Sequence, residues 1–321
     1  MKMPIRWLPL AAALFLALPA ASQGYPTRPV RVIVPFAAGG NTDITARAIG
    51  AKLSEVFRQQ VIVENRPGAA TNIGSELVAK APPDGYTLLM GGATNAINMS
   101  TQAKPPYDTV RDFAPVILCV KGANVLSLHP SVPARNLKEL IALARARPGE
   151  LNFASSGLGS SNQMAGELFK HMAKINIMHI PYKGNTPALT DTLAGNVEMM
   201  FSGVPVLIPH LQSGRLRAVA IGSLKRFSAI PEVPTFDESG LKGYEATTWF
   251  GLMAPIKTPK DIVDRWNTEV GKILASPDLR RRFLNDGLEP MGGSQEEFGR
   301  FIRVEIEKYA RLVKASGMKP Q

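Results

Sequence analysis

Residues 30–47 read VRVIVPFAAGGNTDITAR, and this stretch decides the fold. The β-branched run 30–34 predicts a buried strand, which ends at the proline that follows. Gly39 and Gly40 form a tight turn, after which apolar residues at helical spacing predict a helix over 42–57. A buried strand that passes through a short glycine turn into a helix is typical of α/β proteins with a parallel sheet.

The same strand–turn–helix unit recurs along the chain in two series. We expect the first series to continue with strands over 61–64 and 86–90. Strands of the second series are expected over 125–128, 151–153, 177–180, 197–201 and 216–221. Further helices are expected over 136–147, 163–172, 259–274, 277–284 and 295–314. Two strand-like segments, 116–120 and 249–255, join the two series, so the sequence predicts two α/β lobes around a ligand cleft.

The length of the chain also favours two lobes, because 321 residues is near the practical limit of one hydrophobic core. From the positions of the two connecting segments, we expect lobe 1 to comprise residues 25–120 plus 249–321. Lobe 2 is then expected to comprise residues 121–248. A cleft between two lobes is a common place for a small ligand to bind.

The first 24 residues have the features of a secretory signal peptide. Lys2 and Arg6 precede an apolar run over 7–18, and small residues follow that run. The run is too short for a membrane-spanning helix, which needs about 20 residues, and the cleavage region has no cysteine to carry a lipid anchor. We expect cleavage between residues 21 and 25 and export to the periplasm.

Composition excludes several classes of protein. The chain is 45% apolar and 20% charged, so it is not disordered, and its net charge of +11 becomes +9 once Lys2 and Arg6 are removed. The basic residues lie on expected helices among acidic residues, which indicates a solvated surface, and we expect no nucleic-acid partner. The single cysteine, Cys119, permits no internal disulfide and is expected to be a buried apolar side chain.

Signatures of enzymes are absent from the sequence. It contains no G-x-S-x-G, H-E-x-x-H or Walker A motif, and its glycine turns match the dinucleotide-binding fingerprint poorly. The four histidines lie at no metal-ligand spacing, so each is expected to be structural, and we expect no metal and no cofactor. The candidate cleft offers serines but no histidine near them. A hydrolase or isomerase acting on a small carboxylate is the alternative function.

Three glycine turns, at 36–43, 155–161 and 182–184, are the features of the sequence that point to ligand binding. In each turn glycine lets the backbone approach a ligand, and the N–H groups of the next helix can bind an anion. One such turn is as often an ordinary connection, but three with free hydroxyls favour a binding cleft. We predict that the first two turns face each other across one cleft. Asp43 and Arg47, four residues apart on a helix, are expected to form an ion pair, and the alternative is that Asp43 points into the cleft.

Five segments carry a resemblance that extends over the whole chain after the signal peptide. They are PFAAGGNTDITAR (35–47), VENRPGAATNIGSELVAKAPPDGYTLL (63–89), FASSGLGSSNQMAGELF (153–169), HIPYKGNTPAL (179–189) and WFGLMAPIKTP (249–259). In this combination, the chain resembles the Bug (TctC-type) family, the extracytoplasmic solute receptors of tripartite tricarboxylate transporters.

The resemblance implies a type II periplasmic-binding-protein fold, with two lobes that are joined by hinge strands and close on a small carboxylate-bearing ligand. It also implies a receptor, not an enzyme, that delivers this ligand to a membrane permease of two unlike subunits. Dicarboxylates, aromatic carboxylates, amino acids and nicotinate-like molecules all fit such a site. We expect the receptor to be a monomer.

The resemblance further implies that backbone N–H groups, hydroxyls and water hold the carboxylate, without a required arginine. Gln163 departs from the family pattern, because members often carry histidine there, and its side chain cannot titrate. The expected ligand-binding residues are Phe36, Ala38, Gly39, Gly40, Asn41, Thr42, Asp43, Ala93, Thr94, Asn95, Ser155, Ser156, Gly157, Gly159, Ser160, Gln163, Lys183, Gly184 and Ser202.

Overall fold

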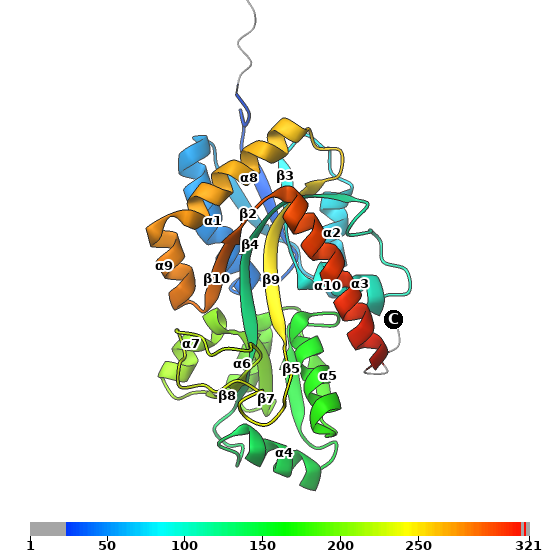
Figure 1. Ribbon diagram of the computed structural model, residues 1–321, viewed down its shortest axis with the longest axis vertical. Helices are drawn as coiled ribbons and strands as arrows, with labels where there is room; N and C mark the ends of the chain where they lie inside the picture. Colours follow the sequence, from blue (N-terminus) through cyan, green and yellow to red (C-terminus); the bar gives the residue numbers. More distant parts are fainter. Residues whose placement is uncertain (1–23, 316–317, 319–321) are drawn as a thin grey trace, which may run out of the picture.

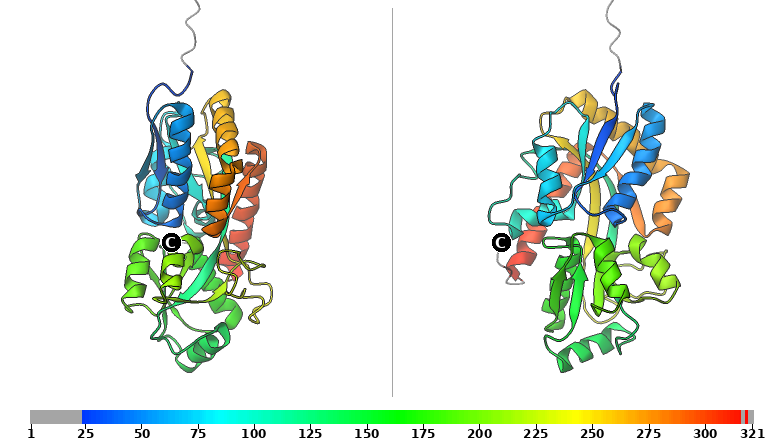
Figure 2. Two further views of the ribbon diagram at one scale, coloured as in Figure 1. Left: turned by 90° about the vertical axis from the view of Figure 1, so that its left-hand side faces the viewer. Right: turned by 180° about the vertical axis from the view of Figure 1, so that it is seen from behind.

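The computed structural model describes residues 24–315 and residue 318, so the expected signal peptide lies almost wholly outside the described residues. Two α/β lobes are stacked along the long axis of the molecule (Figure 1). Strands β4 (Phe113–Leu128) and β9 (Thr247–Pro255) run through the waist between them. The side and rear views in Figure 2 show the same division, with helices on both faces of each lobe.

The sheet of lobe 1 contains both parallel and antiparallel strands. Its order is β2 (Val61–Asn65), β1 (Val30–Val34), β3 (Thr87–Gly92), β9 and β4, and β10 (Leu288–Gly292) pairs with β4. Strand β1 is parallel to β2 and β3, whereas the β3–β9, β9–β4 and β4–β10 pairs are antiparallel.

Helices cover both faces of this sheet, because alternate residues of β1 point to opposite sides. Val32 packs with α1 (Asn41–Phe57), α8 (Lys260–Ala275) and α9 (Pro277–Asn285). Its neighbour Ile33 packs on the other face with α2 (Asn72–Ala79), α3 (Ala93–Thr101) and α10 (Gln295–Ala315). The short 3₁₀ turn η1 (Ala69–Thr71) precedes α2.

Lobe 2 repeats this plan around the second half of β4. Its strand order is β6 (Met178–Pro181), β5 (Asn152–Ser155), β7 (Met199–Gly203) and β4, with β8 (Arg217–Ile221) also paired to β4. One face packs against α4 (Leu137–Ala146) and α5 (Ser161–Ala173), and the other against α6 (Asn185–Leu193) and α7 (Val204–Gln212).

Strand β4 connects the lobes because it changes partners along its length. Residues 113–123 pair with β9, whereas the strand from Asn124 onward pairs with β7 and β8. The two segments expected to join the lobes, 116–120 and 249–255, lie inside β4 and β9, so the expectation of two lobes joined by crossing strands is confirmed.

The expectation of a parallel sheet is confirmed for β2–β1–β3 and β6–β5–β7 but is wrong for the strands at the waist. Strand β4 leaves lobe 1 and β9 returns to it, so the two run antiparallel. Helix α3 and strand β10 were not predicted. Helix α3 begins directly at the end of β3, where the glycines indicate only a turn, and the short β10 contains a proline and no β-branched residue.

Two local predictions are confirmed. Cys119 is completely buried in the core of lobe 1. Asp43 forms the expected helical ion pair with Arg47, with 3.0 Å between the carboxylate Oδ1 and the guanidinium Nε. Helix α1 follows its apolar pattern, because Ile49, Leu53 and Phe57 are all buried against the sheet.

Candidate ligand-binding site

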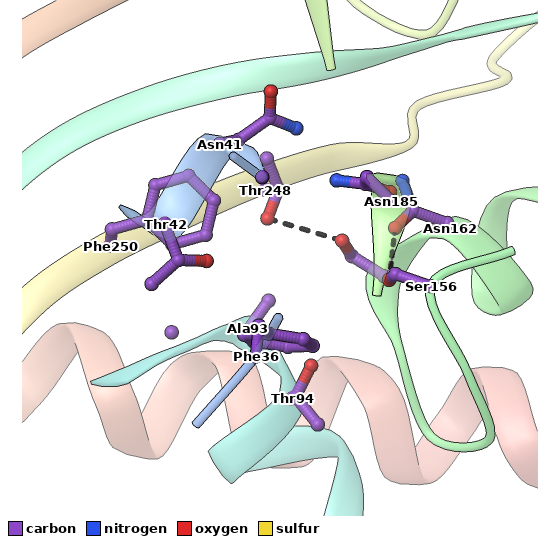
Figure 3. Close-up of a pocket in the computed structure, with 13 residues that line it drawn as sticks. Phe36, Asn41, Thr42, Ala93, Thr94, Ser156, Asn162, Asn185, Thr248 and Phe250 are labelled. Carbon is purple, nitrogen blue, oxygen red and sulfur yellow. Dashed lines mark hydrogen bonds between the residues drawn. The ribbon is translucent and has the colours of Figure 1, made fainter. Parts of the chain in front are cut away.

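A cavity of about 20 Å³ lies between the lobes, and we call it the inner cavity. It holds about one water molecule. The turn after β1 and the turn after β5 both line it, so the predicted meeting of these two turns is confirmed (Figure 3). The lining residues are Phe36, Gly40, Asn41, Thr42, Gly92, Ala93, Thr94, Ser156, Ser161, Asn162, Asn185, Thr248 and Phe250.

Helices α1, α3, α5 and α6 all begin at the inner cavity, because their first residues belong to its lining. Glycines 40, 92 and 184 are the N-caps of α1, α3 and α6, and a glycine has no side-chain oxygen to bind the first N–H groups of a helix. The lining contains no charged side chain. The positive ends of these helices make the cavity suitable for an anion, because the first N–H groups of a helix have no partner within the helix.

The glycine turn of lobe 1 is held in place by Asp43. The carboxylate accepts hydrogen bonds from the Gly39 N–H at 2.9 Å, the Arg47 Nε at 3.0 Å and the Asn65 Nδ2 at 2.9 Å. Burial opposes the charge on Asp43, but these hydrogen bonds outweigh it and hold its pKa below the usual value. The carboxylate therefore supports the turn and does not line the inner cavity.

The serine turn of lobe 2 is held by hydrogen bonds within itself. Ser155 Oγ accepts from the Gly157 N–H at 3.1 Å, and Ser160 Oγ donates to the Gly157 carbonyl at 2.6 Å. Gln163 Oε1 accepts from the Gly159 N–H at 2.7 Å. Most of the polar side chains in this turn are therefore already occupied.

The expectation that no histidine lies near the cleft serines is wrong. His179 Nε2 lies 2.6 Å from Ser155 Oγ, because β6 pairs in parallel with β5 and places His179 opposite Phe153. Burial, with a smaller effect of Lys170, lowers the pKa of His179 to about 4, so the imidazole is neutral at pH 7. Ser155 is fully buried beneath the turn, and the pair is a structural contact there.

The lobes contact each other around the inner cavity. Thr186 Oγ1 at the start of α6 donates a hydrogen bond of 2.8 Å to the carbonyl of Ala38 in lobe 1. A Cβ on Gly184 would lie 2.9 Å from the Ala37 Cβ, and the φ of Gly184 is +146°. Only glycine allows this approach without strain, so the third glycine turn is part of the contact between lobes.

A second hollow adjoins the inner cavity. It has a volume of about 250 Å³, and we call it the outer groove. Phe36 and Ser156 line both spaces. The outer groove is further lined by Pro35, Gly68, Ala69, Ala70, Thr71, Gly157, Leu158, Pro181, Tyr182 and Lys183.

The expected ligand-binding residues fall into distinct places in the structure. Those that line the inner cavity are Phe36, Gly40, Asn41, Thr42, Ala93, Thr94 and Ser156. Gly157 and Lys183 line the outer groove, and Gly159 and Gln163 line a separate pocket beside Leu158. The remaining ones, which line none of these three spaces, are Ala38, Gly39, Asp43, Asn95, Ser155, Ser160, Gly184 and Ser202.

Sequence reasoning missed several residues of the inner cavity. Asn185 follows the predicted turn at 182–184 directly, so its position as the first residue of a helix was a usable signal. Thr248 and Phe250 belong to β9, and no local pattern distinguishes them from a core strand. Asn162 was missed as well, whereas Gly92 and Ser161 lie in turns that the sequence had indicated.

The described residues form neither a metal cluster nor a membrane-spanning helix. Residues 24–315 and 318 contain no group of three or more histidine, cysteine, aspartate or glutamate side chains placed to hold a metal ion. In the same residues, every helix is too short or too polar to cross a lipid bilayer.

Comparison with known proteins identifies the family. Residues 45–318 match the model of the tripartite tricarboxylate transporter family receptor, TctC. The chain belongs to this family. Its members are solute-binding receptors of transporters, so the receptor prediction is confirmed and the enzyme alternative finds no support.

Solved structures give the same result for the fold. A protein from R. palustris with adipate is 38% identical, with a TM-score of 0.91 over 92% of this chain and 100% of that one. The periplasmic binding protein BugD is 33% identical, with a TM-score of 0.89 over 92% and 100%. MatC from Rhodopseudomonas palustris with bound malate is 31% identical, with a TM-score of 0.86 over 90% and 100%. The two-lobe periplasmic-binding-protein fold is therefore confirmed.

Proposed function

We propose that this receptor binds a small carboxylate-bearing solute in the inner cavity. The observation that carries the proposal is that α1, α3, α5 and α6 all begin at a cavity whose lining has no charged side chain. Helix N-termini attract a carboxylate and offer it N–H donors, so no arginine or lysine is needed to hold it. The similar proteins with adipate and with malate support this ligand class.

The proposed mechanism is closure of the two lobes about the crossing strands. A ligand that contacts both lobes binds the closed state more tightly than the open state and so favours it. The inner cavity holds about one water, so we infer that the ligand extends past Phe36 and Ser156 into the outer groove. We assign residues 25–120 plus 249–321 to lobe 1 and residues 121–248 to lobe 2, and the change of partners by β4 near Asn124 supports the first boundary.

We further propose that the receptor acts in the periplasm after removal of the signal peptide and delivers its ligand to the permease of a tripartite tricarboxylate transporter. The family match supports this partner. Closure provides the signal, because only the closed receptor presents both lobes in a fixed relation.

The proposed ligand contacts differ between residues. The side chains and N–H groups that line the inner cavity contact the carboxylate, and Gly157 and Lys183 contact the part in the outer groove. Asp43, Ser155 and Ser160 act through the turns that they hold.

A thermal-shift screen of residues 25–321 tests the proposal. Carboxylates that bind should raise the melting temperature with concentration, because ligand that binds only the folded state stabilises it by RT ln(1 + [L]/Kd). The matched amide of each acid is the control and should give no shift. A panel in which the amides stabilise the protein as well as the acids would contradict the proposed ligand class.

Salt dependence separates the inner cavity from the basic surface. Binding to exposed lysine and arginine weakens steeply with salt, whereas binding at buried helix N-termini does so much less. We expect the affinity of the best carboxylate to change by less than about threefold between low and physiological salt.

A further inference from the structure

A further groove lies at the waist of the molecule, and we call it the hinge groove. Its volume is about 400 Å³. In lobe 1 it is lined by residues of β10 and α10, and in lobe 2 by residues 223–227, which follow β8. Residues of both crossing strands, β4 and β9, line it as well. The hinge groove is therefore a second space between the lobes, and no residue expected to bind the ligand lines it.

The crossing strands lie between the hinge groove and the inner cavity. In the left-hand view of Figure 2, α1 and α6, which begin at the inner cavity, lie on one side of β4 and β9. Helix α10 and residues 222–246 lie on the other side. Thr248 of β9 lines both spaces. A rotation about the crossing strands that opens the inner cavity therefore brings the two walls of the hinge groove together.

The lobes are closed on the cavity side in this structure. Gly159 of lobe 2 lies so near α3 of lobe 1 that a Cβ on it would be 2.5 Å from the Asn98 Oδ1, and Thr186 is hydrogen-bonded to Ala38. The open space of the hinge groove thus belongs to the closed state. Among the described residues, no hydrogen bond or ion pair joins 223–227 to α10, so the two walls are free to approach.

An exposed leucine lies in this groove. Leu224 of lobe 2 is 59% exposed, and it lines the hinge groove together with Phe301 of α10 and Trp249 of β9, both from lobe 1. A single exposed leucine is common on protein surfaces, but this one shares a groove with aromatic side chains of the other lobe. When the groove narrows, Leu224 loses contact with water, and this burial of apolar surface stabilises the open state.

We propose that Leu224 lowers the affinity of the receptor from outside the ligand site, because its side chain is buried in the open state and exposed in the closed state. This inference rests on the proposed function, since it requires a ligand that favours closure. Such a ligand must displace the contact that Leu224 makes in the open state, so the observed affinity is lower than that of the closed site. The same contact favours reopening and release of the ligand.

The variant Leu224→Ala tests the proposal, with Val304→Ala as the matched control. Val304 is an apolar residue of α10 that is 58% exposed and does not line the hinge groove. Small-angle X-ray scattering without ligand should give a smaller radius of gyration for Leu224→Ala than for wild type, nearer to that of the closed structure. Calorimetric titration with adipate and with malate, the acids present in the similar structures, should show binding about fivefold tighter. Val304→Ala should match wild type in both measurements.

A gain of affinity is the informative result, because a substitution that merely damages the fold does not tighten binding. Equal radii of gyration for wild type and Leu224→Ala, weaker binding by Leu224→Ala, or the same changes in Val304→Ala would overturn the proposal. The failure of the proposed function is a separate result. If no carboxylate binds, that function is overturned, whereas the scattering of the proteins without ligand still decides whether Leu224 stabilises the open state.

Discussion

The glycine turn of lobe 1 and the serine turn of lobe 2 face the same inner cavity, but their polar groups have different partners. On the lobe 1 side, Asn41 lines the cavity with a side-chain oxygen that has no partner. On the lobe 2 side, Ser155, Ser160 and Gln163 are hydrogen-bonded within the turn, and Ser156 donates to Asn162. The polar side chains of the serine turn are fixed by hydrogen bonds within lobe 2. The glycine turn instead leads to a side-chain oxygen without a partner, that of Asn41, at the cavity.

This difference changes how hydroxyl-rich loops are interpreted. A hydroxyl in a glycine turn can bind a ligand, or it can stabilise the turn by bonding to the backbone two or three residues away. Ser155 and Ser160 do the second. At the inner cavity, the buried side-chain oxygens without a partner belong to Asn41 and Asn185, the first residues of α1 and α6.

The largest expected effect comes from filling the cavity on the lobe 1 side. Gly40 has an extended backbone with φ −81°, and a Cβ there meets nothing closer than 3.6 Å, so a side chain is tolerated by the fold. The larger Gly40→Val side chain reaches toward Asn185 and should reduce ligand affinity by about 100-fold, the effect of roughly 3 kcal/mol of overpacking. Calorimetric titration measures this, and the melting temperature without ligand should stay nearly unchanged.

The graded variant Gly40→Ala is its control. It adds only the Cβ and should reduce affinity by less than about tenfold. Equal affinities for wild type and Gly40→Val would remove the inner cavity from the ligand site.

On the lobe 2 side, the largest effect concerns pH. The folded-state pKa of His179 is about 4, below the ordinary value of 6.5, so the unfolded chain binds the proton more strongly between these values. The stabilisation is therefore complete above about pH 6.5 and is lost as the pH falls toward 4. The total is on the order of 3 kcal/mol.

Urea unfolding at a series of pH values checks this contribution. His179→Gln should remove most of the loss of stability between pH 6.5 and 4, whereas His171→Gln, at an exposed position late in α5, should keep it. Parallel pH profiles for wild type and His179→Gln would show that the Ser155–His179 contact does not couple the turn to protonation.

The sequence predicted the parts of the fold that depend on local pattern. Strand β1 and helix α1 follow from β-branched residues, a glycine turn and an apolar stripe, all within 28 consecutive residues. The crossing strands were predicted at the points where one series of alternating strands and helices ends and the other begins. Strand β10 could not be found in this way, because its five residues join the sheet only through pairing with the distant β4.

The candidate site was predictable to the level of loops but not of atoms. Sequence identifies the turns at 36–43 and 155–161, since glycine and hydroxyl residues cluster there. It cannot show that Ser155 meets His179, because that contact depends on the register of β5 against β6. It likewise cannot separate Asn41, whose amide is free, from Asn162, whose amide is paired.

A smaller effect is expected where the lobe 1 turn is anchored. Asp43→Asn keeps the shape of the side chain but places a donor where Gly39, Arg47 and Asn65 supply donors. We expect a loss of about 2 kcal/mol in the free energy of unfolding and weaker ligand binding, because the turn is no longer held. Asp84→Asn is the control, since its pair with Arg28 is exposed and should contribute less than about 1 kcal/mol.

The smallest effect tests the role of the serine turn directly. Ser160 is the N-cap of α5, where its Oγ accepts from the Gln163 N–H at 3.1 Å and donates to the Gly157 carbonyl. Ser160→Ala should therefore lower the free energy of unfolding by about 1 kcal/mol. Because this hydroxyl does not line the inner cavity, ligand affinity should change by less than about threefold once the folded fraction is accounted for. Denaturant unfolding and calorimetric titration on the same preparation measure the two quantities. A large loss of affinity with unchanged stability would mean that Ser160 contacts the ligand. The serine turn would then offer a polar side chain to the ligand, as the glycine turn does.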